Sequence, residues 1–170
     1  MVTAFPELPP PTDRFGDLTE PEQLVVCAFR RWLAGGRQRE MLWRVLAHDL
    51  EPSEARTALK GLEAMIRVLT AHAHRNISYH QPCCPCVGPD EAALLTLVTA
   101  VQRAQPELAK LVAGSFVHHN GLNVLLAAAD VFASALKRGA RDLPLRYAFC
   151  AEPAGELEIE AAPITAPTLH

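Results

Sequence analysis

Cysteine and histidine side chains crowd into one short segment of this 170-residue sequence. Six of them, all soft or borderline metal ligands, fall within the fifteen positions from His72 to Cys86. Cys83 and Cys86 have the two-residue gap that lets two thiolates reach one tetrahedral ion, and His80 stands the same interval upstream. Thiolate sulfur and imidazole nitrogen are ligands that zinc prefers, so the segment predicts a zinc site.

A zinc site built on this segment needs a fourth ligand, because structural zinc is four-coordinate. At about 100° per residue, the helix before the segment puts His72 at the edge of its apolar face and turns His74 away from it. The same reckoning for a helix that begins at Pro106 places His119 on the inward face. The predicted metal ligands are therefore His80, Cys83 and Cys86 with either His72 or His119, and with Cys84 as the reserve thiolate.

The same thiols allow other interpretations. Iron or copper would suit a histidine-rich site, whereas an iron-sulfur cluster normally takes four cysteines. The order Cys83, Cys84, Pro85, Cys86 resembles the thioredoxin active site, in which proline precedes the second cysteine of the pair. The resemblance covers four residues and lacks the strand-to-helix junction that lowers a thiol pKa there, so the thioredoxin activity is not carried over. A redox or metal sensor that uses the three thiols remains the alternative function, and inert packing in a proline-rich turn is a third interpretation.

Other kinds of chemistry have less support in the sequence. The stretch Arg30–Arg44 holds five arginines around a Gly35–Gly36 turn, a basic patch of the kind that contacts phosphates. Acidic residues outnumber basic ones by 19 to 16, so we expect a solvated surface there, with nucleic-acid binding as a lesser alternative. No nucleophile elbow or Gly-rich phosphate loop occurs, so we assign no catalytic residue and expect a protein that is not an enzyme.

Six amphipathic helices are predicted to position this segment. Apolar residues recur at helical spacing, and proline, acidic residues and glycine mark the starts and ends. The predicted helices cover about residues 20–34, 38–50, 53–75, 89–101, 106–121 and 122–137. Short connections between them predict an all-α bundle of five or six helices.

The chain is expected to form one domain with two tails. Residues 1–17 are a proline-rich arm, residues 18–139 are the helical bundle with the Cys/His loop at 72–88, and residues 140–170 are an extended C-terminal segment. In that segment apolar residues alternate with polar or small ones over Leu145–Phe149 and Leu157–Ile159. This period of two predicts two short strands, which would form a β-hairpin.

The bulk properties favour a cytoplasmic binding or regulatory module. The N-terminus has a proline cluster where a secretory signal would need positive charge followed by an apolar run. No apolar stretch reaches the roughly 20 residues of a membrane span. We expect a metal-fixed loop, and tails that contact a protein partner or a second copy of the chain.

Overall fold

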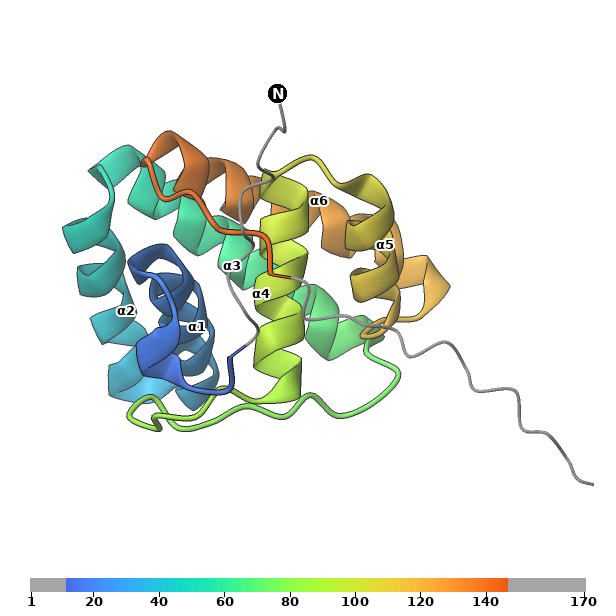
Figure 1. Ribbon diagram of the computed structural model, residues 1–170, viewed down its shortest axis with the longest axis horizontal. Helices are drawn as coiled ribbons and strands as arrows, with labels where there is room; N and C mark the ends of the chain where they lie inside the picture. Colours follow the sequence, from blue (N-terminus) through green and yellow to red (C-terminus); the bar gives the residue numbers. More distant parts are fainter. Residues whose placement is uncertain (1–11, 147–170) are drawn as a thin grey trace, which may run out of the picture.

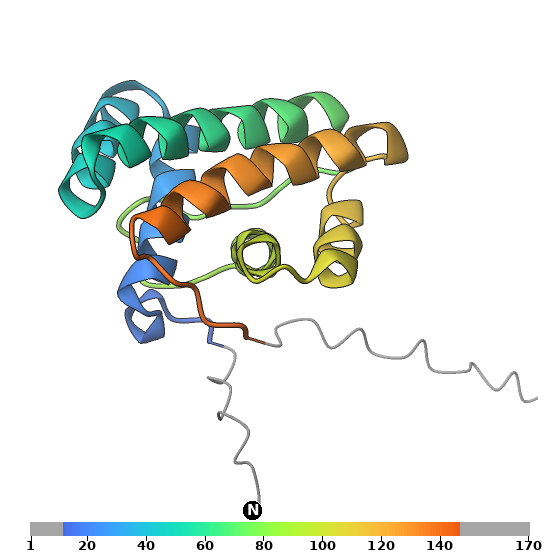
Figure 2. The same cartoon turned by 90° about the horizontal axis from the view of Figure 1, so that it is seen from above.

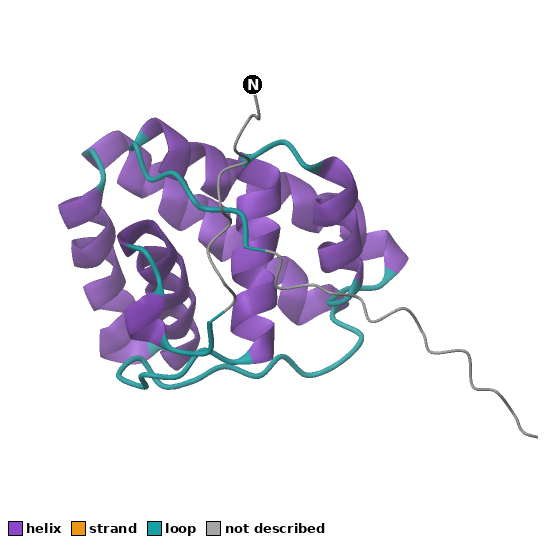
Figure 3. Cartoon of the chain, viewed as in Figure 1, coloured by secondary structure: helices purple, strands orange, loops and turns teal. Residues whose placement is uncertain are grey.

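Six α-helices make up the described part of the chain, residues 12–146 of a computed structural model (Figure 1). They are α1 (Glu20–Ala34), α2 (Gly36–Asp49), α3 (Pro52–His72), α4 (Pro89–Gln102), α5 (Pro106–Gly114) and α6 (His119–Arg138). A 3-10 turn, Phe15–Asp17, precedes α1. Within residues 12–146 there is no strand beyond two isolated β-bridges (Figure 3). The prediction of an all-α bundle is confirmed for these residues.

Proline and glycine set most of the helix boundaries. Proline stands in the first turn of four helices, at Pro21, Pro52, Pro89 and Pro106. Its missing N–H costs nothing there, because the first turn has no acceptor for that group. The backbone N–H of Thr19 donates to Glu22 Oε2 at 2.8 Å and closes the start of α1. Gly35 ends α1 with a φ of 67°, which glycine adopts without strain.

One predicted boundary is wrong in a way that matters for the site. The predicted helix over residues 106–121 ends earlier, at Gly114. Phe116 and Val117 then turn into the core, where they are 0% and 3% exposed, because burying these apolar side chains outweighs continuing the helix. His119 therefore begins α6, and its side chain is exposed rather than inward-facing.

The central helix of the bundle is α4. The long helices α3 and α6 lie side by side and antiparallel, and Figure 2 shows α4 end-on where that pair runs across the view. Gly61 lets α3 approach α6 closely, because a Cβ there would lie 2.5 Å from the backbone nitrogen of Phe132. Several α4 side chains are at most 5% exposed, namely Ala93, Leu94, Leu97, Val98 and Ala100. Any polar group in the first turn of α4 must therefore find its partners inside the protein.

The tails are described only in part. Leu145 lies in a segment without regular structure, residues 141–146. The rest of the first predicted strand, to Phe149, and the second one, Leu157–Ile159, lie outside the described residues. Among residues 12–146, none of the helices combines the length and the hydropathy that a membrane span requires.

Candidate functional site

Two buried acids at the start of α4 organise the connection in which the predicted cysteine ligands lie. This connection, residues 73–88, runs from the end of α3 to the start of α4, and its cysteine part passes below α1 in Figure 1. Asp90 and Glu91 are 6% and 3% exposed. A buried carboxylate is costly without hydrogen-bond partners. The partners found for these two among the described residues come from the connection and from α1.

Glu91 forms a buried ion pair with Arg30 of α1. Arg30 Nε donates to Glu91 Oε1 at 2.7 Å, and Nη2 donates to Oε2 at 2.9 Å, the two-point geometry that a guanidinium favours. Both side chains are buried, at 0% and 2% exposure. Desolvation raises the pKa of Glu91, but hydrogen bonds from Arg30, the Gly88 N–H and His80 outweigh it and lower that pKa from 4.5 to about 2. The carboxylate is therefore ionised at neutral pH.

The same guanidinium holds the backbone of the cysteine segment. Arg30 Nη1 donates to the carbonyl oxygen of Cys84 at 2.8 Å, and Nη2 donates to that of Cys86. The carbonyl between them, that of Pro85, accepts the backbone N–H of the 3-10 turn at 2.7 Å. Three successive carbonyls are thus bound by the protein. The thiols remain at the surface, because Cys83 and Cys86 are exposed and Cys84 is half-buried.

Glu91 also orients the imidazole of His80. The Nδ1 atom of His80 lies 2.9 Å from Glu91 Oε2, and the His80 backbone N–H donates to Oε1 at 2.9 Å. An ionised carboxylate only accepts, so Nδ1 carries a proton and Nε2 holds the lone pair of the neutral ring. The ring packs over Gly88, where a Cβ would lie 2.9 Å from His80 Cε1. A carboxylate behind the imidazole is the outer partner that metal-binding histidines commonly have.

Asp90 fixes the earlier half of the connection in a similar way. Arg75 Nη2 and Nη1 donate to the two carboxylate oxygens of Asp90 at 2.7 and 3.0 Å. Ser78 donates its backbone N–H at 2.7 Å and its hydroxyl at 3.0 Å. The bond from Arg75 is the main cause that lowers the pKa of Asp90 to about 2, against the opposing effect of burial. Adjacent acids of α4 therefore anchor two successive parts of one loop.

The thiol with the largest effect on Cys86 is that of Cys84, rather than that of Cys83, which the spacing paired with it. The neighbouring Cys84 thiol is the main cause that raises the pKa of Cys86 above its ordinary value. A raised pKa keeps the thiol protonated and weakens it as a free nucleophile.

The predicted fourth ligands, His72 and His119, lie elsewhere, at the junction of α3 and α6. His72 is half-buried and packs closely against α6. A Cβ added at Gly121 would lie only 2.6 Å from the His72 Cβ. Figures 1 and 2 show this junction at the opposite side of the molecule from the cysteine segment. Among the residues that the structure describes, no group of three or more His, Cys, Asp or Glu side chains is placed to hold a metal ion. A metal would therefore need the exposed loop side chains to turn toward one another.

Arg30 does not belong to the basic surface patch that the sequence predicted. Arg30 is buried against Glu91, so its assignment to a solvated surface is wrong. Arg39, which follows the Gly35–Gly36 turn, stacks over the Trp32 ring at 4.1 Å and thereby joins α2 to α1. Glu91 was not among the predicted site residues, although a glutamate at the third position of a helix is half of the capping-box signal; here it accepts the Gly88 backbone N–H at 2.8 Å.

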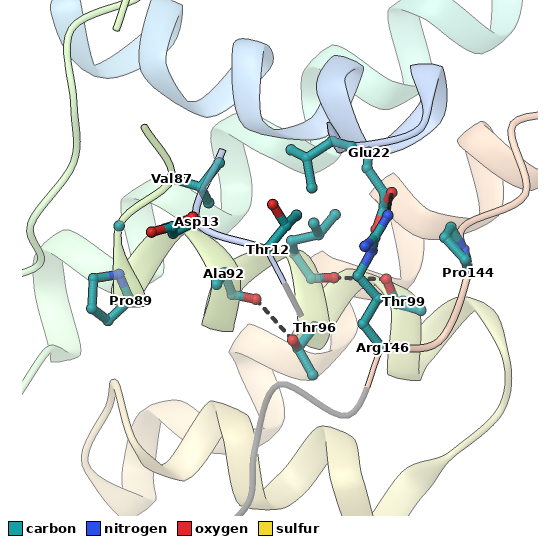
Figure 4. Close-up of a pocket in the computed structure, with 13 residues that line it drawn as sticks. Thr12, Asp13, Glu22, Val87, Pro89, Ala92, Thr96, Thr99, Pro144 and Arg146 are labelled. Atoms are coloured by element: carbon teal, nitrogen blue, oxygen red, sulfur yellow. Dashed lines mark hydrogen bonds and ion pairs between the residues drawn. The ribbon is translucent and has the colours of Figure 1, made fainter. Parts of the chain in front are cut away.

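A pocket of about 500 Å³ lies beside the loop, between α1, α4 and the segment after α6 (Figure 4). Val87 and Gly88 at the end of the loop line it, together with apolar residues of α4. At one end Arg146 Nη2 donates to Glu22 Oε2 at 2.9 Å. The hydroxyls of Thr96 and Thr99 donate to carbonyls of their own helix. The volume is in the range of small-molecule sites, but none of the predicted site residues lines it.

No protein-family model, curated protein or solved structure matches the chain.

Proposed function

We propose that the Cys/His loop binds a thiophilic metal ion, with zinc favoured over iron or copper, and that the protein acts as a binding or regulatory module whose loop the metal fixes. The observation that carries this proposal is the hydrogen bond between His80 Nδ1 and the ionised Glu91, 2.9 Å long. It leaves Nε2 as the nitrogen with a lone pair, three positions before the first thiol.

The loop by itself offers enough ligands for zinc. Because His72 and His119 lie at the α3–α6 junction, we assign the site to His80 with Cys83, Cys84 and Cys86, a set of one imidazole and three thiolates that is common in structural zinc sites. The backbone of this segment is held by Arg30, so the rearrangement concerns side chains at the surface. Such side chains change rotamer at little cost.

Metal analysis of the purified full-length chain tests the proposal. We expect one equivalent of thiolate-bound zinc, which shows as thiolate-to-metal charge-transfer absorption when cobalt replaces it. The triple variant Cys83→Ser, Cys84→Ser, Cys86→Ser should lose the charge-transfer absorption, which only thiolate ligands give. The matched control is Cys27→Ser, since Cys27 is a half-buried cysteine of α1. Absence of the thiolate-to-cobalt absorption from the wild-type chain, or its persistence in the triple variant, would contradict the proposal.

A second variant tests whether His80 is a metal ligand. Replacing His80 by Gln removes the imidazole but leaves Glu91 paired with Arg30, so the fold should persist. We expect zinc affinity to fall about 10- to 100-fold or more. The control is His48→Gln, at an exposed histidine of α2. Equal affinity of both variants would show that His80 is not a ligand.

The thiol pair favours one other function, a redox sensor. The Cys84 thiol is close enough to that of Cys86 to be the main influence on the pKa of Cys86. Hydrogen peroxide would oxidise them to a disulfide: the sulfurs bond to each other, and the two thiol protons and two electrons convert the peroxide to two water molecules. Reversible loss of two thiols without bound metal would favour this function, whereas thiols that zinc protects from peroxide would favour the first. Sedimentation of the chain with and without zinc tests whether the module binds a second copy of itself.

A further inference from the structure

A pair of histidines apart from His80 and the three cysteines forms a second candidate metal site. His74 and His118 have ring centroids 5.6 Å apart and ring planes at 66°. Both side chains are exposed, so a hydrated ion can reach them. Neither residue is among the predicted ligands of the cysteine loop.

The backbone fixes the two histidines relative to each other. The His74 N–H donates to the Phe116 carbonyl at 3.1 Å, and the His118 N–H donates to the His72 carbonyl at 3.0 Å. These bonds flank an isolated antiparallel bridge between the end of α3 and the segment before α6. The two imidazoles are therefore carried by paired backbone segments, which limits how far they can separate.

The protonation pattern of His74 suits a metal ligand. Its Nε2 lies 3.2 Å from the carbonyl oxygen of Gly114. A carbonyl oxygen only accepts, so Nε2 carries the proton and Nδ1 holds the lone pair of the neutral ring. A backbone carbonyl on one ring nitrogen is the usual outer partner of a histidine that binds metal through the other.

We propose that His74 and His118 together bind one borderline divalent cation, such as Zn²⁺, Ni²⁺ or Cu²⁺, with water in the remaining positions. Imidazole is a preferred ligand of these ions. At metal-to-nitrogen distances of about 2.0–2.1 Å, two rings on one ion have centroids roughly 5 Å apart. The observed distance of 5.6 Å between the ring centroids therefore requires only a small movement of the two exposed side chains. The ion would join the end of α3 to the start of α6.

This site shares no ligand with the proposed site of His80 and the three cysteines, so its test is independent of the proposed function. Calorimetric titration with zinc chloride is done on the full chain in which Cys83, Cys84 and Cys86 are replaced by Ser. We expect one equivalent to bind. His74→Gln and His118→Gln should each weaken binding at least about tenfold, as loss of a ligand does. The matched control, His48→Gln, should bind as before, because His48 is an exposed histidine on α2.

A second measurement keeps both histidines in place and so does not depend on how the variants fold. Zinc added to the same chain with ¹⁵N-labelled histidine should shift the ring nitrogens of His74 and His118. Absence of binding, unchanged ring signals for both residues, or variants that bind as tightly as the parent would each overturn the proposal and leave the pair as an aromatic packing contact.

Discussion

Replacing Arg30 by Met should be among the most damaging single changes in this protein. The side chain is fully buried and donates four hydrogen bonds: two to the Glu91 carboxylate and one each to the carbonyls of Cys84 and Cys86. Its guanidinium also lies 5.4 Å from the centroid of the Phe15 ring. Methionine fills much of the same volume but satisfies none of the acceptors.

The size of the expected stability loss depends on the buried groups that lose their partner when Arg30 is replaced. Removing one member of a buried ion pair costs about 3–5 kcal/mol, because the other charge stays buried without its counterion. Glu91 keeps the N–H groups of Gly88 and His80, which offset part of the loss. The freed carbonyls of Cys84 and Cys86 lie near the surface and can turn toward water. We therefore expect the free energy of unfolding to fall by about 4 kcal/mol, a large share of the 5–15 kcal/mol typical of a domain.

Urea unfolding followed by tryptophan fluorescence measures this loss, since Trp32 and Trp43 lie in α1 and α2. The control is Arg67→Met, at a side chain that is 73% exposed, where the change should stay within about 1 kcal/mol. A double variant, Arg30→Met with Glu91→Leu, removes the lone charge and should be more stable than the single variant. A single variant within about 1 kcal/mol of the wild type, or a double variant that is less stable still, would refute this account of the ion pair.

Lowering the pH and replacing single glycines by alanine provide two further tests of the same structure. Folding lowers the pKa of Asp90 from 3.8 to about 2 and that of Glu91 from 4.5 to about 2. The two carboxylates therefore stabilise the folded chain at neutral pH, and this stabilisation is lost as the pH falls from about 4.5 toward 2. Unfolding at a series of pH values should show a loss of at most about 2 and 3 kcal/mol from the two groups. Gly61→Ala should lower stability by about 1–3 kcal/mol in urea unfolding, because its Cβ would meet the backbone of Phe132. Gly114→Ala meets nothing within 4 Å and should be neutral or stabilising, and equal effects of the two alanines would contradict the close approach of α3 and α6.

The helices could be predicted from the sequence because their signals are local. Apolar periodicity, proline in the first turn and the glycines after Ala34 each act within one or two turns, and the structure places α1, α3 and α4 close to the predicted ranges. The break between α5 and α6 is different. It depends on the burial of Phe116 against the rest of the bundle, which no local pattern records. The predicted position of His119 was wrong for that reason.

The role of Arg30 could not be predicted because it depends on a residue 61 positions away. A charged side chain on a helix is normally solvent-facing, and this expectation put Arg30 in a surface patch. One local sign did point the other way. Arg30 follows the buried Val26 by one turn and so shares its face. Periodicity can show that such a residue faces inward, but not which buried acid makes that position tolerable.

The two acids of α4 also bear on how the loop would bind a metal. Small zinc domains are unfolded without the ion, so the free energy of metal binding drives their folding. Here Asp90 holds Arg75 and Ser78, while Glu91 holds His80 and, through Arg30, the cysteine backbone. Because the first turn of a helix favours negative charge, both acids stand where the backbone of α4 stabilises them. The loop backbone and the His80 imidazole are therefore arranged by the protein alone, and a metal would have to order only the thiol side chains.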